Sequence, residues 1–215
     1  ILAVSGGVDS MVLLDLVSKY HPKAQIIVAH FDHSLRGAES DGDREFVVEY
    51  CRTHGLTCET ERLDIAKLAK DEKKSIENAA RHYRYEFLSA VAKKYEAKYI
   101  LTAHHGDDRI ETAVFNLIRG SKLGGIHSLS QLSTRHCERM RSNPESESMD
   151  CHVDSSNLLA MTGVIFRPML HATKTEILGY AKEQNIPFRE DSTNSDIDYQ
   201  RNYLRHEVLP RFESI

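Results

Sequence analysis

The sequence predicts an α/β fold, with a doubly wound, mostly parallel five-stranded sheet and helices on both faces. Short apolar runs alternate with longer amphipathic stretches along the chain, the pattern of successive strand–helix units. Residues 26–29 are apolar without interruption, which is typical of a strand buried on both faces of a parallel sheet. Residues 1–4 form a similar run that leads directly into a glycine turn and then a helix.

That turn, residues 5–10, has the sequence Ser-Gly-Gly-Val-Asp-Ser and precedes a helix expected at 9–20. Free backbone N–H groups, two hydroxyls and a helix N-terminus all favour an anion at such a point. An ordinary turn with a Ser or Asp cap is the alternative. Asp9 is a carboxylate in this anion site, which makes most sense if a divalent cation lies between it and phosphate. The residues expected to hold the phosphates are Ser5, Gly6, Gly7 and Ser10.

The strand at 26–29 ends in a polar segment that contains His30, Asp32, His33 and Arg36. Ligands of open α/β sheets bind at the carboxyl ends of the strands, so these side chains are candidates for substrate contact. A zinc site is a weaker alternative, because adjacent residues of an extended chain point in opposite directions. Substrate contact and ordering of the loop are therefore favoured.

The central part of the chain continues the alternation of helix and strand. The expected elements are a helix at 40–54, a strand at 56–63, a helical turn at 65–70 and a long helix at 75–95. Spacings of three and four predict the core stripe of the long helix. This stripe comprises Ile76, Ala80, Tyr83, Phe87 and Val91. Arg81 and Arg84 lie on a neighbouring face, together with Leu88, as surface charges or as phosphate contacts.

The fourth strand, 99–103, is followed by two histidines and an acidic helix start near Asp107. Carboxylates in a first helical turn can act as caps. Three carboxylates and two histidines at the end of a strand exceed what a cap needs, so a cation such as Mg²⁺ or an ammonium group is the natural complement. The residues concerned are His104, His105, Asp107, Asp108 and Glu111. Ile110, Val114, Leu117 and Ile118 are expected to bury the helix.

The last part of the chain is less regular. Residues 130–162 show no sustained period, which indicates disorder or an insertion, and we assign them no chemistry. A strand at 164–170, a helix at 173–184 and a last helix at 196–206 are expected to follow. Arg201 and Arg205 are four residues apart in that last helix. They form either a surface pair or a clamp on phosphate oxygens.

Composition limits the class of protein. The 215 residues suit one domain, and 40% hydrophobic content supports a packed core. No apolar run approaches the roughly 18 residues of a membrane span, so no membrane association is expected. The four cysteines form no CxxC pair, which favours a reducing cytoplasm. A net charge of −4 excludes a global basic field, so any nucleic acid would bind a local patch.

Seven motifs occur in one order, and together they resemble the tRNA(Ile)-lysidine synthase family of the PP-loop ATP pyrophosphatase superfamily. The segments are SGGVDS at 5–10, HFDHSLR at 30–36, NAAR at 78–81, AHHGDDRIET at 103–112, RG with GGI in 119–126, RPML at 167–170 and EDSTNSDIDYQRNYLRHEVLP at 190–210. The first motif identifies only the superfamily. The acidic motif and the C-terminal motif point to the narrower family.

The resemblance implies an adenine nucleotide alpha hydrolase-like fold and an ATP-dependent ligase. L-lysine would be joined to the wobble cytidine of an isoleucine tRNA with a CAU anticodon, through an adenylated tRNA intermediate. Ser5, Gly6, Gly7, Asp9, Ser10, His30 and His33 would bind ATP, with Mg²⁺ on Asp9. His104, Asp108 and Glu111 would bind lysine, and Asp9, Asp32, Asp108 and Arg205 would be catalytic. Arg36, Arg81, Arg84, Arg119, Arg201 and Arg205 would contact tRNA or phosphate.

Arg109 stands where the family usually has Gln. We expect residues 1–190 to form the catalytic domain, with the insertion at 130–162. Residues 191–215 would lead towards C-terminal domains that the family generally carries. The alternatives are another PP-loop tRNA modifier, such as a thiolase, and a non-catalytic nucleotide- or tRNA-binding remnant. The sequence does not decide between a monomer and a homodimer.

Overall fold

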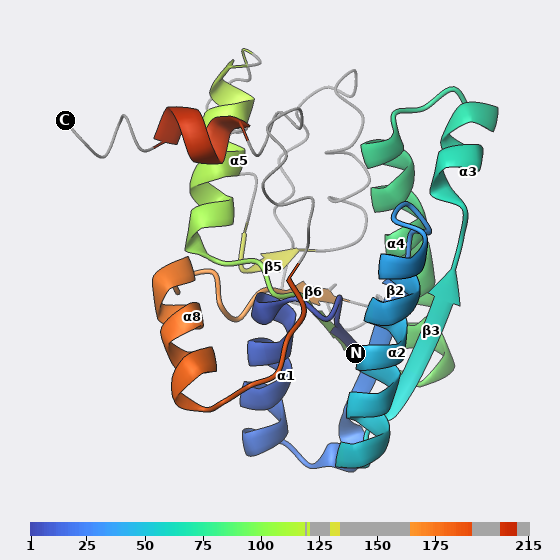
Figure 1. Ribbon diagram of the computed structural model, residues 1–215, viewed down its shortest axis with the longest axis vertical. Coiled ribbons are helices and arrows are strands. Elements are labelled where there is room, and N and C mark those ends of the chain that lie inside the picture. Colours follow the sequence, from blue (N-terminus) through green and yellow to red (C-terminus); the bar gives the residue numbers. More distant parts are fainter. Residues whose placement is uncertain (119, 121–129, 134–163, 191–202, 210–215) are drawn as a thin grey trace.

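The computed structural model describes residues 1–118, 120, 130–133, 164–190 and 203–209. In this part of the chain, six strands form one sheet in the order β3-β2-β1-β4-β6-β5 (Figure 1). The strands are β1 (Leu2–Ala3), β2 (Ile27–Asp32), β3 (Thr57–Arg62), β4 (Tyr99–Leu101), β5 (Leu132–Ser133) and β6 (Val164–Phe166). The first five in spatial order are parallel, which confirms the predicted fold class. The two-residue β5 adds an antiparallel edge that the sequence pattern did not predict.

Helices cover both faces of the sheet (Figure 1). They are α1 (Val8–Tyr20), α2 (Ala38–His54), α3 (Ile65–Asp71), α4 (Ile76–Lys94), α5 (Gly106–Ile118) and α8 (Lys174–Glu183), with the short helices η1 (Lys23–Gln25) and η4 (Leu204–Val208). Side chains of α1, α2 and α8 pack with Val28 on one face. Side chains of α3 and α4 pack with Ile27 and Ala29 on the other. Because successive strand residues point to opposite faces, β2 contributes to both cores.

Two predicted apolar stripes are partly wrong. In α4, Ile76 is exposed, whereas Leu88, expected on a neighbouring face, is buried. In α5, Ile110, Leu117 and Ile118 are 54%, 58% and 68% exposed, although they were expected to bury the helix. Helical periodicity shows which residues share a face, but only the tertiary arrangement decides whether that face is covered. Helix α5 extends away from the sheet and contacts η4 (Figure 1).

The strand order places a topological switch point between β1 and β4. From β1 the chain moves outward through β2 and β3, and it then returns to the other side of β1 as β4. The two strands are held in register, with Leu2 opposite Leu101. Connections leaving such a pair in opposite directions open a crevice at the carboxyl edge, where ligands of α/β sheets bind. The glycine turn after β1 and the acidic segment after β4 both lie at this edge.

Candidate functional site

The turn after β1 is organised around the hydroxyl of Ser10. This oxygen accepts hydrogen bonds from the backbone N–H groups of Ser5 and Gly6, each at 3.2 Å. It also donates to the carbonyl of Gly7 at 2.9 Å. The hydroxyl of Ser5 accepts from the N–H of Gly7 at 3.4 Å. Backbone N–H groups and both hydroxyls thus converge at the N-terminus of α1, as phosphate binding requires.

Gly6 cannot be replaced in this turn without strain. Its φ of +96° is a conformation that residues with a Cβ rarely adopt. An added Cβ would also lie 3.4 Å from Val47 Cγ2 and 3.5 Å from Phe46 Cδ1, so the loop packs closely on α2. The carbonyl of Gly6 accepts a hydrogen bond from the N–H of Arg189 at 3.0 Å. The loop is therefore held from both sides.

Asp9 lies in the first turn of α1, beside the glycine turn, and its side chain is 30% exposed. Its Oδ1 accepts a hydrogen bond from Lys174 Nζ at 2.6 Å. The same oxygen lies 4.0 Å from Nε2 of His105. Asp9 is thus paired with the ammonium group of Lys174. The divalent cation expected at this carboxylate stays a prediction.

The segment after β4 brings its own carboxylates to the same place. His105 is buried, and its Nε2 lies 3.5 Å from Oδ2 of Asp108. Asp108 Oδ2 also accepts from the backbone N–H of His105 at 3.0 Å, as a cap of α5. Oδ2 of Asp107 lies 3.9 Å from His105 Nδ1 and accepts from the backbone N–H of Lys174 at 3.0 Å. One buried imidazole therefore stands between Asp9 and the acidic start of α5.

The remaining residues predicted for an ammonium site lie on the same segment. His104 Nδ1 and Thr102 Oγ1 are 2.9 Å apart. Glu111, one turn into α5, is only 3% exposed. A carboxylate is rarely buried without a partner of opposite charge or several hydrogen bonds. Glu111 is therefore positioned more deeply than a capping role would require.

Lys174 was not assigned a role from the sequence. His105 and Asp107 were counted in the general cation site, but not among the residues expected to bind lysine. The adjacent histidines offered two choices, and only His104 was selected. Lys174 is the first residue of α8, and 165 positions separate it from Asp9. The signal that could have found it is topological, because a helix after a parallel strand also begins at the carboxyl edge.

His30, in β2, is buried, and His33, directly after β2, is partly buried; both are electrically neutral at physiological pH. Burial lowers the pKa of His30. Burial, with help from the nearby Arg84 guanidinium, lowers the pKa of His33 to about 4. Nδ1 of His30 donates to the carbonyl of Val4 at 2.9 Å, which leaves Nε2 as an acceptor. In the described residues, neither His30 Nε2 nor His33 Nδ1 has a hydrogen-bond partner, and such buried atoms are normally satisfied.

Asp32 orders the loop beside these histidines. The carboxylate is buried, and its Oδ1 accepts from the N–H of Ser34 at 2.8 Å. Its Oδ2 lies 3.4 Å from Nε of Arg62, which also contacts the hydroxyl of Ser34. This geometry agrees with the expected role in loop ordering and does not test a catalytic one. In the described part of the chain, no group of three or more His, Cys, Asp or Glu residues is arranged to hold a metal.

The predicted arginines fall into two groups. Arg36 Nη2 donates to Asp43 at 2.7 Å, and Arg189 Nε donates to the other oxygen of Asp43 at 2.5 Å. Arg81 and Arg84 lie over the ring of Tyr85 on α4, with their guanidinium carbons 5.1 and 5.2 Å from its centroid. Arg119, Arg201 and the side chain of Arg205 lie outside the described residues. Asp43 and Arg189 had no assigned role in the sequence.

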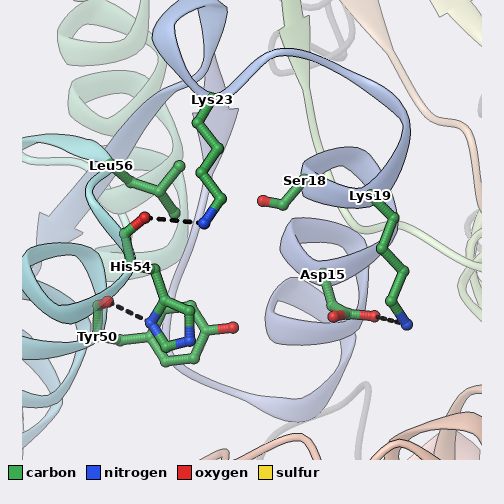
Figure 2. Close-up of a pocket in the computed structure, with 7 residues that line it drawn as sticks. All are labelled: Asp15, Ser18, Lys19, Lys23, Tyr50, His54 and Leu56. Atoms are coloured by element: carbon green, nitrogen blue, oxygen red, sulfur yellow. Dashed lines mark hydrogen bonds and ion pairs between the residues drawn. The ribbon is translucent and has the colours of Figure 1, made fainter.

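A hollow lined by side chains lies far from the crevice, between the C-terminal ends of α1 and α2 (Figure 2). Lys23 Nζ donates to the carbonyl of His54 at 3.1 Å, and the rings of Tyr50 and His54 stack with centroids 4.0 Å apart. Lys19 and Asp15 form an ion pair at 2.9 Å. None of the predicted site residues lines this hollow, and its charged groups Asp15, Lys19 and Lys23 already have partners. We assign it no ligand.

Among the described helices, none is long and apolar enough to cross a bilayer. The chain is 36% identical over 214 residues to tRNA(Ile)-lysidine synthase from Bacillus licheniformis, covering 98% of this chain and 39% of that protein. It is 37% identical over 217 residues to tRNA(Ile)-lysidine synthase from Thermotoga sp. strain RQ2, covering 100% and 45% respectively. The chain thus spans less than half the length of these two relatives.

Among solved structures, the fold is similar to that of U34-tRNA thiolase NcsA from Methanococcus maripaludis, with its [4Fe-4S] cluster. The TM-score is 0.61 at 16% identity, with 100% of this chain and 71% of that chain covered. At this identity, the similarity concerns the fold alone. The PP-loop domain model matches residues 1–212. With the turn after β1 and the parallel sheet described above, this match shows that the chain belongs to the PP-loop domain family.

Proposed function

We propose that the protein is a tRNA(Ile)-lysidine synthase. It would use ATP to adenylate the wobble cytidine of an isoleucine tRNA with a CAU anticodon. The ε-amine of L-lysine would then displace AMP to form lysidine. Identity of 36% and 37% to proteins of this name, along essentially the whole chain, supports the proposal. A tRNA substrate also favours a cytoplasmic location.

One observation carries the proposal: His105 Nε2 lies 4.0 Å from Asp9 and 3.5 Å from Asp108. A two-step ligation needs the phosphates and the amine donor at one reacting centre. The turn after β1 offers the phosphate site, and the start of α5 offers the ammonium site. Only the imidazole of His105 separates the proposed phosphate and ammonium sites. At this separation, one atom of the substrate would be able to contact both sites.

ATP would bind with its phosphates on Ser5, Gly6, Gly7 and Ser10. The fit of Mg²⁺ at Asp9 is supported by the ammonium group that already contacts this carboxylate at 2.6 Å. When bound, Mg²⁺ supplies positive charge that neutralises the polyphosphate. One protein carboxylate together with substrate phosphates is a usual environment for this ion.

His30 in β2 and His33 directly after it would bind the nucleoside part of ATP. Because His30 and His33 are neutral, they would contribute hydrogen bonds rather than positive charge. The Nε2 lone pair of His30 has no partner among the described residues, so it can accept from an amino or hydroxyl group of the nucleotide. This supports the assignment of both histidines to the ATP site.

Lysine would bind at the start of α5, with His104, Asp108 and Glu111 around its ammonium groups. An amine attacks only when it is deprotonated, so a nearby group has to take its proton. Asp32 and Asp108 are the two carboxylates proposed for this step. Asp108 is favoured, because it lies in the same helical turn as the proposed lysine site. Asp32, in contrast, is held by Ser34 and Arg62.

The tRNA would approach over the proposed basic residues, which are Arg36, Arg81, Arg84, Arg119, Arg201 and Arg205. Arg81 and Arg84 lie on α4, and their planar guanidinium groups suit phosphate oxygens. The target cytidine has to leave its stack to reach the crevice. With Arg205, these groups would position the anticodon and the charged intermediate.

The test is multiple-turnover release of pyrophosphate from ATP, with an isoleucine tRNA transcript bearing CAU. We expect turnover to require L-lysine, and the tRNA to gain the mass of one lysine less one water. L-Arginine and a transcript with U at the wobble position are the matched controls. Turnover that ignores the identity of the amino acid would favour another PP-loop tRNA modifier. Absence of any ATP turnover would favour a non-catalytic binding module.

A further inference from the structure

Lys174 is placed at the crevice by the start of α8. Thr173 and Glu176 form a capping box: the N–H of Thr173 donates to Glu176 Oε2 at 2.7 Å, and the N–H of Glu176 donates to Thr173 Oγ1 at 3.2 Å. The backbone N–H of Lys174 donates to Asp107 at 3.0 Å, which ties α8 to α5. The base of this side chain is therefore fixed, whereas its ammonium sits at the end of a flexible stem.

The ammonium of Lys174 and a divalent cation would compete for Asp9. Nζ lies 2.6 Å from Oδ1, whereas Mg²⁺ binds carboxylate oxygens at roughly 2.0–2.1 Å. Two cations at these distances from one oxygen would repel each other strongly. The Asp9 side chain is 30% exposed, so the incoming ion has access to it. Binding of the metal at Oδ1 therefore requires Lys174 to leave this oxygen.

The displaced ammonium has a new partner within reach. A metal–nucleotide complex at the glycine turn brings a polyphosphate that retains net negative charge. The four-carbon stem of Lys174 starts at a fixed backbone beside Asp9, so a small rotation keeps Nζ near the bound phosphates. A compact ammonium on a flexible stem is a common phosphate ligand in nucleotide sites.

We propose that Lys174 is a further nucleotide-binding residue of the crevice. It neutralises Asp9 before the nucleotide arrives, and it binds the polyphosphate once a divalent cation has taken its place. This inference rests on the proposed function, because it takes the turn after β1 as the ATP site. It predicts that replacing Lys174 lowers the affinity for nucleotide and raises the affinity for the metal ion.

The first measurement is calorimetric binding of a non-hydrolysable ATP analogue, and separately of AMP, in the presence of Mg²⁺. Lys174→Met should weaken analogue binding about 10-fold or more, the loss expected for one charge-assisted hydrogen bond. AMP binding should change much less, because AMP lacks the β and γ phosphates. Lys174→Arg should restore much of the affinity. Lys182→Met, an exposed lysine in the last turn of α8, is the matched control.

The second measurement uses Mn²⁺ without nucleotide, followed by paramagnetic broadening of the amide resonances of Gly7 and Asp9. Lys174→Met should broaden these resonances at several-fold lower Mn²⁺ than wild type, because the competing ammonium is gone. If Lys174 merely supported the fold, replacing it would not raise the affinity for metal while lowering the affinity for nucleotide. Thermal unfolding of each variant separates a binding effect from loss of structure.

The outcomes separate this inference from the function on which it rests. Unchanged analogue affinity in Lys174→Met, or equal losses for the analogue and AMP, would overturn the role of Lys174 alone. Unchanged Mn²⁺ broadening would overturn the competition with the metal. No analogue binding by wild type would overturn both proposals. Opposite shifts without any lysidine formation would retain the role of Lys174 and remove the proposed ligation.

Discussion

Replacing His33 should flatten the dependence of stability on pH. The pKa of this histidine falls from 6.5 in the unfolded chain to about 4 in the folded one, because the ring is buried and lies near Arg84. The unfolded chain therefore binds the proton more readily, and stability present above pH 6.5 is lost as the pH falls towards 4. The loss attributable to His33 is about 2 kcal/mol at pH 5 and about 3 kcal/mol in full.

The assay is urea unfolding at pH 8 and pH 5, followed by circular dichroism, for wild type and His33→Asn. The difference in unfolding free energy between the two pH values should be smaller in the variant by about 2 kcal/mol. His30, whose pKa is also lowered by burial, contributes equally to both proteins and cancels. His33→Gln should behave as His33→Asn does. An undiminished pH difference in both variants would refute the reasoning, as would imidazole NMR shifts showing a charged His33 at pH 6.

Two further predictions concern the crevice. Asp9→Ala should abolish ATP turnover, measured as pyrophosphate release, whereas Asp15→Asn, six residues further along the same helix, should retain it. Equal activity of both variants would contradict the role of Asp9. Asp43→Ala should lower the free energy of unfolding by about 2 kcal/mol, because two guanidinium groups lose a largely buried charged acceptor. Urea unfolding at several salt concentrations measures this effect, and an unchanged midpoint would show that the two ion pairs contribute nothing.

The sheet could be predicted from the sequence because its strands are short, apolar and separated by helical patterns. The helix faces could be predicted only where the sheet covers them. Val47 and Cys51 of α2 are buried, because α2 lies flat on the sheet. The apolar side chains of α5 stay exposed, because α5 extends away from it. Nothing in the spacing of Ile110 and Leu117 distinguishes these two situations.

The glycine turn and the acidic segment, which form the two halves of the crevice, could also be predicted from the sequence, since each directly follows a strand. The contacts between distant residues at the crevice could not be predicted. Asp9 and Asp108 stand in local motifs, but the ion pair between Asp9 and Lys174 joins segments 165 residues apart. Burial was equally hard to predict: His33 lies in a polar segment, yet burial in the folded chain and the nearby Arg84 guanidinium of α4 lower the pKa of its ring. Local pattern identifies the residue types, whereas strand order decides which of them meet.

The separation between the proposed phosphate and ammonium sites depends on the sheet more than on the side chains that line them. Leu2 is in register with Leu101, and the N–H of Leu101 donates to the carbonyl of Ile1 at 2.7 Å. Neighbouring strands lie about 4.8 Å apart, and each leads within a few residues into a helix that begins at the carboxyl edge. Asp9 and Asp108 occupy the first turns of these two helices. A side-chain change in the crevice can therefore alter charge or hydrogen bonding while the two sites stay in place, because backbone hydrogen bonds between β1 and β4 hold them there.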